Sequence, residues 1–428
     1  MQPLDPTLAV SAAWDRPFVA LDGGTATLLV HLVTPATQDK SDRQPVDVAF
    51  VLDRSGSMGG DKLALAKQAI LSAATRLTDR DRIALVAYDH EVDTLLPLLP
   101  ATATTRQTLR SVLRLVDARG STNLSGGWLQ GCGELADIVG DEATGTAPER
   151  VHRVILLTDG QANQGIVDPD ELATHAQELR RRGITTTALG VGVDFDGPFL
   201  SQLSEAGGGN FVFIEQPGEL AAFFATELDE LVSIAARNVS VAISVPAGAT
   251  LDLLNPYPTE TGVGTTHVAV GDLPDASEVE LVAAITFPPA RTGAAHAVAV
   301  RATWRDTDGT HRDVRLPLAP VVAAPAVEVD AAPADVAVLE ASAIHGTARL
   351  QRAAARSAQR HDAAAVATAR LRMSAMLQAA PASGRVMAEQ AAQLRFSPAD
   401  DGTMAAADVL RMAEHGFATR RRRQPRER

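Results

Sequence analysis

Three short segments rich in side-chain oxygens could together bind a metal ion. They are Asp53-Arg54-Ser55-Gly56-Ser57, Gly120-Ser121-Thr122-Asn123-Leu124 and Thr158-Asp159-Gly160. Carboxylate and hydroxyl oxygens are the ligands of hard divalent cations such as Mg²⁺ and Mn²⁺, and such a site needs no thiolate or imidazole. The candidate metal ligands are Asp53, Ser55, Ser57, Thr122 and Asp159.

Each segment also has a simpler interpretation. Asp53 alone could stabilise a turn, because Asp and Ser form local hydrogen bonds to the backbone. Thr122-Asn123 could cap the helix that follows, and Asp159-Gly160 could form an ordinary turn. All three segments in order, each beside a predicted strand or helix, favour the metal site over three unrelated turns.

The segments that would position these residues alternate between strands and helices. VDVAFVL (46–52) is almost continuously apolar, which is typical of a strand buried on both faces. Further strands are predicted at 82–88, 151–157, 184–192 and 210–214. The alternation predicts an α/β domain over 46–232, a doubly wound, Rossmann-like parallel sheet covered by helices. Ligands bind beyond the carboxyl ends of such strands, so the three segments should converge there.

Patterns typical of β-strands flank this domain on both sides. Residues 1–45, most clearly ATLLVHLV (26–33), and residues 233–325 show short alternating segments separated by turn residues. The second region predicts an antiparallel β-sandwich. The first region is too small to fold alone. We therefore expect its strands to complete that sandwich, with the α/β domain inserted into it; a plain tandem arrangement is the alternative.

The C-terminal part of the chain is rich in Ala and Arg and has helical periodicity. Residues 326–419 are predicted to be helical, with breaks at Pro381 and Ser397-Pro398 that divide them into about four helices. These helices either dock on the sandwich or project toward a partner. Residues 321–335 are a linker or a last edge strand. The basic run at 420–428 has no apolar residue to bury, and we expect it to be disordered.

The three oxygen-rich segments resemble those of the von Willebrand factor type A (vWA) family. In that family a DxSxS motif, a distant Thr and a distant Asp form a metal-ion-dependent adhesion site. Asp53, Ser55, Ser57, Thr122 and Asp159 match these positions, and the resemblance covers about residues 46–232. The flanking β segments resemble those of bacterial relatives of the inter-alpha-trypsin inhibitor heavy chains and the calcium-activated chloride channel regulators.

The resemblance implies metal-dependent capture of a protein partner. In the family the serines and the threonine contact the metal directly, while the aspartates often act through water. The implied ion is Mg²⁺ or Mn²⁺, with Ca²⁺ as a further candidate. Because neutral hydroxyls leave most of the charge of the ion uncompensated, an open coordination position attracts an Asp or Glu carboxylate of the partner.

Composition and motifs argue against several other functions. The formal net charge of -13 argues against a general nucleic-acid binder, which must neutralise phosphates. The sequence contains neither HExxH nor a phosphate-binding glycine loop in its proper context. A hard ion held by hydroxyls also lacks the neighbouring general base of metal hydrolases. We therefore expect a protein that is not an enzyme. Cys132, the single cysteine, rules out an intrachain disulfide and is expected to be buried.

The expected location is the cytoplasm of a bacterium. The first residues lack a signal-peptide pattern, and no apolar run reaches the ~18 residues of a membrane-spanning helix. The leading hypothesis is a non-enzymatic, metal-dependent protein-interaction module. The alternative is an accessory subunit of a MoxR-type AAA+ ATPase that acts in complex assembly or metal insertion. Surface adhesion would require a secretion route.

Overall fold

The chain forms two compact units, one made of residues 39–233 and the other of residues 1–38 together with 234–428. The computed structural model describes residues 7–36, 44–143, 150–160, 163–192, 195–214, 233–395 and 406–418, and also residues 219, 223, 227, 404 and 422–423. The first unit is an α/β domain, and the second consists of β-sheets and a group of helices.

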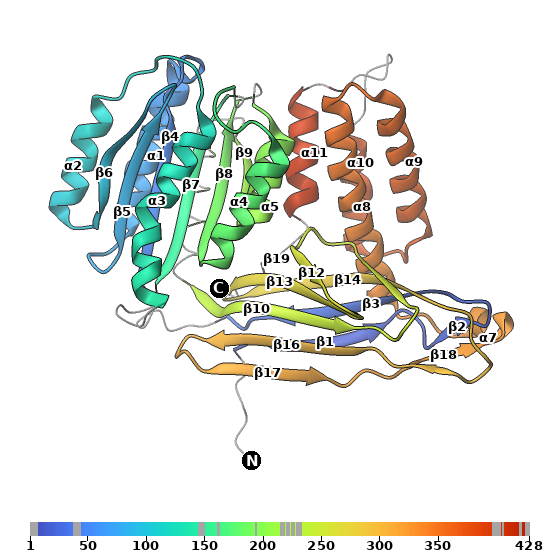
Figure 1. The fold of residues 1–428 in the computed structure, drawn as a ribbon. Coiled ribbons are helices and arrows are strands. Elements are labelled where there is room, and N and C mark those ends of the chain that lie inside the picture. Colours follow the sequence, from blue (N-terminus) through green and yellow to red (C-terminus); the bar gives the residue numbers. More distant parts are fainter. Residues whose placement is uncertain are drawn as a thin grey trace. The chain divides into compact units, whose positions relative to one another are not determined.

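The described residues of the α/β unit form one sheet of six strands in the order β6-β5-β4-β7-β8-β9 (Figure 1). These strands are β4 (Val46–Asp53), β5 (Arg82–Tyr88), β6 (Val92–Pro100), β7 (Val151–Thr158), β8 (Ile184–Val191) and β9 (Gly208–Ile214). β6 runs antiparallel to β5, and the other neighbouring strands are parallel. The prediction of an α/β domain with a central parallel sheet is confirmed.

Strand β6 is the one strand of this sheet that the sequence pattern does not predict. It contains Pro97 and ends at Pro100, and prolines cannot donate hydrogen bonds to a neighbouring strand. An edge strand tolerates them, because one of its sides has no neighbour, and β6 lies at the edge of the sheet. The prolines argue against a strand when the sequence is read alone, but they are compatible with a strand at the edge of the sheet.

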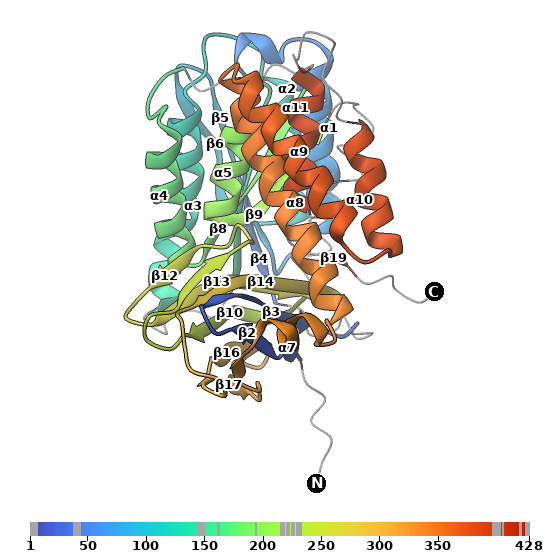
Figure 2. The ribbon, with the colours of Figure 1, turned by 90° about the vertical axis from the view of Figure 1, so that its right-hand side faces the viewer.

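Helices cover both faces of this sheet. They are α1 (Asp61–Arg76), α2 (Ala103–Arg114), α3 (Leu124–Ala143), α4 (Pro169–Arg181) and α5 (Gly197–Gly207). α3 packs on the central strands and α4 and α5 pack on β8, while α1 lies on the opposite face (Figure 2). α4 begins where the sequence specifies it: the Asp168 side chain caps the first turn and Pro169 occupies its first position. Cys132 of α3 is buried, as expected.

The described residues of the second unit form three sheets. Their strand orders are β1-β3-β14-β11, β12-β13-β10-β16-β17 and β15-β18-β2. The strands are β1 (Ala9–Trp14), β2 (Phe18–Ala20), β3 (Gly24–Val33), β10 (Ile234–Ser244), β11 (Thr250–Leu253), β12 (Thr259–Thr261), β13 (Thr265–Pro274), β14 (Ser277–Phe287), β15 (Ala295–His296), β16 (Ala299–Asp306), β17 (His311–Leu316) and β18 (Val321–Ala324). β3 pairs with β14 along its whole length, so strands far apart in the sequence lie side by side.

A group of helices follows these strands, and the predicted C-terminal helical region is confirmed. The helices are α7 (Ala326–Ala331), α8 (Val336–Gln359), α9 (Ala363–Ala379), α10 (Gly384–Arg395) and α11 (Ala406–Ala418). α8 packs against both α9 and α11 and also touches β3 and β14. Asp335 caps the start of α8, and Asp362 caps the start of α9 directly after the end of α8, which helps to separate these two helices.

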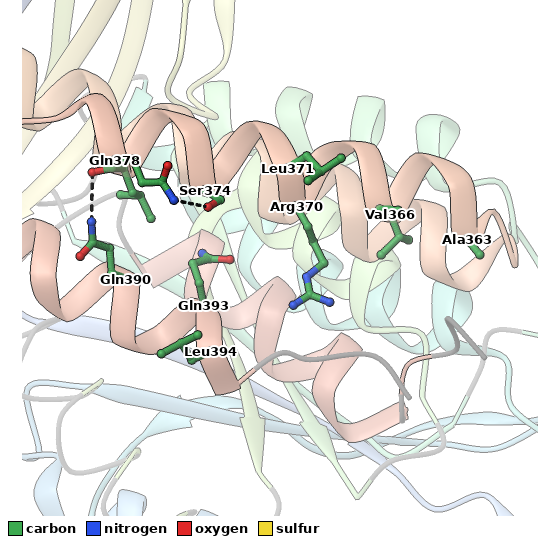
Figure 3. Close-up of a pocket in the computed structure, with 11 residues that line it drawn as sticks. Ala363, Val366, Arg370, Leu371, Ser374, Gln378, Gln390, Gln393 and Leu394 are labelled. Atoms are coloured by element: carbon green, nitrogen blue, oxygen red, sulfur yellow. Dashed lines mark hydrogen bonds between the residues drawn. The ribbon is translucent and has the colours of Figure 1, made fainter. Parts of the chain in front are cut away.

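Helices α9 and α10 border a groove of about 700 Å³ (Figure 3). Leu371 and Leu394 of its lining are mostly exposed, and Gln390 Nε2 donates to the Leu377 carbonyl (3.1 Å). None of the described residues that line the groove carries a carboxylate. The described lining therefore does not provide the carboxylate ligands that the predicted metal site includes.

The expectation that residues 420–428 are disordered is wrong for two of them. Arg422 and Arg423 form β19, which pairs with Glu278 and Ser277 of β14; the others lie outside the described residues. Strands pair through hydrogen bonds between backbone groups, so a strand without apolar side chains can still pair. The register places Arg422 opposite Glu278. Among the described residues, no helix is both long and apolar enough to cross a membrane.

Candidate metal centre

Strand β4 delivers Asp53 to the carboxyl edge of the α/β sheet. All residues of β4 are buried, as expected of an apolar strand that is covered on both faces. β4 lies between β5 and β7, where the strand order changes direction, and ligands of open α/β sheets bind at such a point. Asp53 ends β4 and Asp159 directly follows β7, so the two carboxylates come from adjacent strands.

The Asp53 carboxylate is wholly buried and accepts two hydrogen bonds. Oδ1 accepts from the backbone N–H of Ser55 (2.7 Å) and Oδ2 accepts from the Thr158 hydroxyl (2.6 Å). Burial raises the pKa of Asp53; the hydrogen bonds from Thr158 and Ser55 oppose this rise, and the charge of Asp159 adds to it. A buried carboxylate of this kind is stabilised in its charged form by a cation nearby.

Hydroxyl groups connect the first segment with the third. Ser55 Oγ lies 3.1 Å from Ser57 Oγ, and the Ser57 hydroxyl donates to Asp159 Oδ1 (2.7 Å). Asp159 is wholly buried, and its second oxygen, Oδ2, lies 2.5 Å from the ammonium group of Lys62. The first and third segments therefore converge at the edge of the sheet.

Thr122 approaches the same place from the second segment. Gly160 has no side chain, and a Cβ added there would lie 3.2 Å from Thr122 Oγ1 and 3.6 Å from Ser57 Oγ. The two hydroxyl oxygens thus face a common space beside Gly160. In the part of the chain that the structure describes, Thr122 Oγ1 has no hydrogen-bond partner, so its lone pairs remain available to a ligand. The structure brings all of the sequence-predicted site residues together.

Backbone hydrogen bonds hold the three segments in register. The Gly56 N–H donates to the Gly120 carbonyl (3.1 Å), which ties the first segment to the second. Asn163 ties the second segment to the loop after Asp159: its Oδ1 accepts from the Thr122 N–H (3.0 Å), and its N–H donates to the Thr122 carbonyl (3.3 Å). Nothing in the sequence singles out Asn163, because it stands in a polar loop where asparagine is common.

Tyr88, at the end of β5, leaves a buried polar atom without a well-placed partner. Its hydroxyl is buried beside Asp53 and Thr158 but makes no hydrogen bond of ordinary geometry within the described residues. Burial raises the pKa of Tyr88, and the charge of Asp53 raises it further, which places the phenol in the field of that carboxylate. Buried hydroxyls are nearly always paired, often with ordered water. A poorly satisfied hydroxyl close to Asp53 fits a centre that takes up an ion and its water.

The donor set fits a hard divalent cation. It consists of two buried carboxylates and the hydroxyls described above, and contains neither imidazole nor thiolate. Oxygen ligands of this kind suit Mg²⁺, Mn²⁺ or Ca²⁺ rather than the softer transition metals.

A second acidic group, Asp89-His90-Glu91, lies beside the site and offers carboxylate and imidazole ligands. Arg119 Nε lies 2.7 Å and Arg54 Nε 3.3 Å from Asp89 Oδ2. Burial would raise the pKa of Asp89, but the backbone hydrogen bond from Glu91 and the charges of Arg54 and Arg119 lower it below its usual value. The charge of Asp89 is therefore balanced by arginines, and the group holds the first and second segments together.

Comparison with known proteins identifies the α/β unit. The family model of the von Willebrand factor type A domain matches residues 47–226. YfbK of Escherichia coli is 27% identical over 212 residues, which cover 49% of this chain and 35% of that protein. Human inter-alpha-trypsin inhibitor heavy chain H4 is 30% identical over 212 residues, which cover 48% of this chain and 22% of that protein. The chain thus matches well under half the length of these two relatives.

A solved structure shares the fold over nearly the whole chain. The von Willebrand factor type A protein from Catenulispora acidiphila superposes with a TM-score of 0.71 and 19% identity, and the match covers 97% of this chain and 98% of that one. At this identity the likeness shows the fold alone. Because the family model and the fold agree on the α/β unit, residues 47–226 are a von Willebrand factor type A domain.

Proposed function

We propose that this protein is a non-enzymatic interaction module that binds an Asp or Glu side chain of a partner protein through a divalent metal. Asp53, Ser55, Ser57, Thr122 and Asp159 would hold the metal. One observation carries the proposal: the Thr122 and Ser57 hydroxyls face one space beside Gly160, and Ser57 is hydrogen-bonded to the buried Asp159. vWA domains commonly serve as protein-interaction modules, which supports the same function.

The proposed chemistry follows from the charges at the centre. The hydroxyl ligands are neutral, and the two carboxylates are partly engaged in hydrogen bonds with Ser55, Thr158 and Ser57. A divalent ion held here by neutral hydroxyls and by carboxylates already engaged in hydrogen bonds would attract an incoming carboxylate to an open coordination position. Mg²⁺ or Mn²⁺ is the proposed ion, and Ca²⁺ is the further candidate.

The engagement of both carboxylates supports a binding role rather than a catalytic one. A general base must lie within hydrogen-bond reach of the proton that it removes and must be able to accept it. Asp53 already accepts from Ser55 and Thr158, and Asp159 from Ser57 and Lys62. Each carboxylate thus already accepts hydrogen bonds from two groups of the protein itself, which favours a structural and ligand-holding role over that of a base.

We also propose that the vWA domain is inserted into one β-sandwich, in preference to a tandem arrangement. The pairing of β3 with β14 supports this architecture, because it joins strands that lie on the two sides of the vWA domain in the sequence. Leu28 and Leu32 of β3 also share one buried core with Val241 of β10 and Leu281 of β14. Strands of both large sheets thus contribute to the same core.

Titration of the full chain with Mg²⁺ and Mn²⁺ tests the function, followed by capture of partner proteins in Mg²⁺ and in EDTA. We expect one divalent site, and partners that EDTA releases. Thr122→Ala should weaken metal binding by about tenfold or more, since a ligand is lost. It should also reduce capture while the fold stays intact, because the Thr122 hydroxyl has no partner among the described residues.

Thr108→Ala is the matched control. This exposed threonine of α2 bonds only within its own helix, to the Thr104 carbonyl, so metal binding and capture should be unchanged. Tight Zn²⁺ binding without any response to Mg²⁺ or Mn²⁺ would contradict the proposed ion. A partner that is retained both in EDTA and by Thr122→Ala would not be bound through this centre.

A further inference from the structure

Lys62 brings a positive charge into the candidate metal centre. It lies in the first turn of α1, and its ammonium nitrogen is 2.5 Å from Asp159 Oδ2. Asp159 is wholly buried, whereas the Lys62 side chain is 30% exposed. The ammonium group therefore compensates a buried carboxylate while its side chain retains a route to solvent.

A glycine beside the end of Lys62 leaves room for this side chain. Gly192 directly follows β8, the strand next to β7, and has a φ of +82°, a conformation that favours glycine. A Cβ at Gly192 would lie 3.2 Å from Lys62 Cε and 3.3 Å from Lys62 Nζ. Any larger residue would press on the end of the lysine. The close approach of Gly192 and the ion pair with Asp159 together define a place for the ammonium group.

Lys62 and a divalent ion would both bind the negatively charged carboxylate of Asp159. One oxygen of Asp159 accepts from Ser57, a proposed metal ligand, and the other is bound to Lys62. Two cations that share one buried carboxylate repel each other, and the repulsion is strong where solvent screens it poorly. Metal binding is therefore most favourable when the ammonium group has moved away from Asp159.

We propose that Lys62 is an exchangeable counter-cation of the metal centre. It balances Asp159 in the metal-free protein and lowers the affinity of the centre for divalent metal, so that the site fills only when the metal is abundant enough to displace it. This inference rests on the proposed function, since it describes how the same centre is regulated. Lys62 thus has two effects: it stabilises the fold of the metal-free protein, and it weakens the binding of metal.

Lys62→Met tests this role in the full chain, because methionine is unbranched, of similar length and uncharged. Titration with Mn²⁺ should give a Kd lower by about tenfold, which corresponds to ~1.4 kcal/mol. Without metal, the variant should unfold at a lower temperature than the wild type, because the buried Asp159 loses its counter-charge. Addition of Mn²⁺ should then raise its unfolding temperature more than that of the wild type.

Lys67→Met is the matched control on the same helix. The ammonium group of Lys67 donates a hydrogen bond to the Val116 carbonyl and has no bond to Asp159. Its substitution therefore removes the same charge from the helix but leaves the contacts of Asp159 as they are. Its Kd for Mn²⁺ should stay within about twofold of the wild-type value. Lys62→Gln is a second neutral variant that can still donate a hydrogen bond to Asp159, and it should tighten Mn²⁺ binding in the same direction if Lys62→Met folds poorly.

The outcomes separate this inference from the function on which it rests. Equal or weaker Mn²⁺ binding by the Lys62 variants would overturn the counter-cation role and leave the metal function standing. If the wild type and the variants all fail to bind Mn²⁺, the proposed function falls and the inference falls with it. If Lys67→Met tightens binding as much as Lys62→Met does, the effect reflects net charge and the specific role is refuted.

Discussion

At the scale of single residues, the geometry of the centre depends on a side chain that is not itself a proposed ligand. Asn163 exchanges two hydrogen bonds with the backbone of Thr122 and so fixes the loop that presents the Thr122 hydroxyl. Groups that orient ligands commonly affect metal affinity almost as much as the ligands do. Asn163 is therefore a positioning residue.

Asn163→Ala should weaken Mn²⁺ binding by about tenfold, because the Thr122 N–H loses its acceptor and the loop gains freedom. The measurement is titration of the full chain with Mn²⁺. Gln164→Ala is the control: its side chain donates to the Ser121 hydroxyl (2.8 Å) in an exposed contact, and its loss should leave the affinity unchanged. Equal effects of the two substitutions would show that general loosening of the loop, and not the Asn163 contact, controls the metal affinity.

At the scale of elements, a buried ion-pair network joins the sheet of the second unit to its helices. Glu280 of β14 accepts from Arg385 of α10 through both oxygens (2.9 and 2.7 Å), and His345 Nε2 of α8 lies 3.1 Å from Glu280 Oε2. Burial would raise the pKa of Glu280, but the hydrogen bonds and charges of His345 and Arg385 hold it well below its usual range. The network stabilises the docking of α8 and α10 on β14.

Glu280→Gln should lower the free energy of unfolding of this unit by about 3 kcal/mol at pH 7, because the buried charge of Glu280 and its paired hydrogen bonds with Arg385 are lost. Since the pKa of Glu280 is lower in the folded state, its contribution is complete above the unfolded pKa of about 4.3. It shrinks as the pH falls toward the folded value. Hydrogen exchange of the slowest amides in α8 and β14, at pH 7 and at pH 4, measures both effects.

Asp252→Asn is the control for this network. Asp252 of β11 pairs with Arg349 of α8 (2.7 Å), so it joins the same sheet to the same helix, but both side chains are about half exposed. Such a pair contributes at most ~1 kcal/mol. A loss at Glu280→Gln no larger than that at Asp252→Asn would mean that the buried network adds little to the docking of the helices.

At the scale of the whole molecule, the proposed insertion predicts that the short N-terminal region determines the stability of strands more than 200 residues away. Leu32 of β3 is wholly buried in the core shared by the two large sheets. Leu32→Ala should destabilise this unit by about 2–5 kcal/mol. Hydrogen exchange of the full chain should then show lost protection in β10, β14 and β16 as well as in β3, with β4 and β7 unaffected.

Leu52→Ala is the reciprocal control, because Leu52 is wholly buried in β4 of the vWA domain. It should reduce protection in β4 and β7 and leave β3 and β14 as they are. If Leu32→Ala loosened only β1 and β3, the N-terminal strands would be an appendage, and the tandem arrangement would describe the chain better.

The sequence by itself determined the local features. The continuous apolar run of β4 and the alternation of strands and helices predicted a parallel α/β sheet, since these periodicities reflect how each segment is buried. The position of each oxygen-rich segment beside a strand or a helix also predicted that Asp53, Thr122 and Asp159 would meet. Parallel strands present their carboxyl ends at one edge whatever their exact neighbours are.

Only the tertiary structure decided which side chains complete the centre and how distant strands pair. Lys62, Tyr88 and Asn163 reach the centre from a helix, a strand end and a loop that have no distinctive pattern. The sequence pattern did not predict β6, because it contains prolines, or β19, because it consists of two arginines. Both strands pair through backbone groups. These contacts depend on strand register and side-chain direction. Both are set when distant segments pack together, and neither is encoded in the periodicity of any one segment.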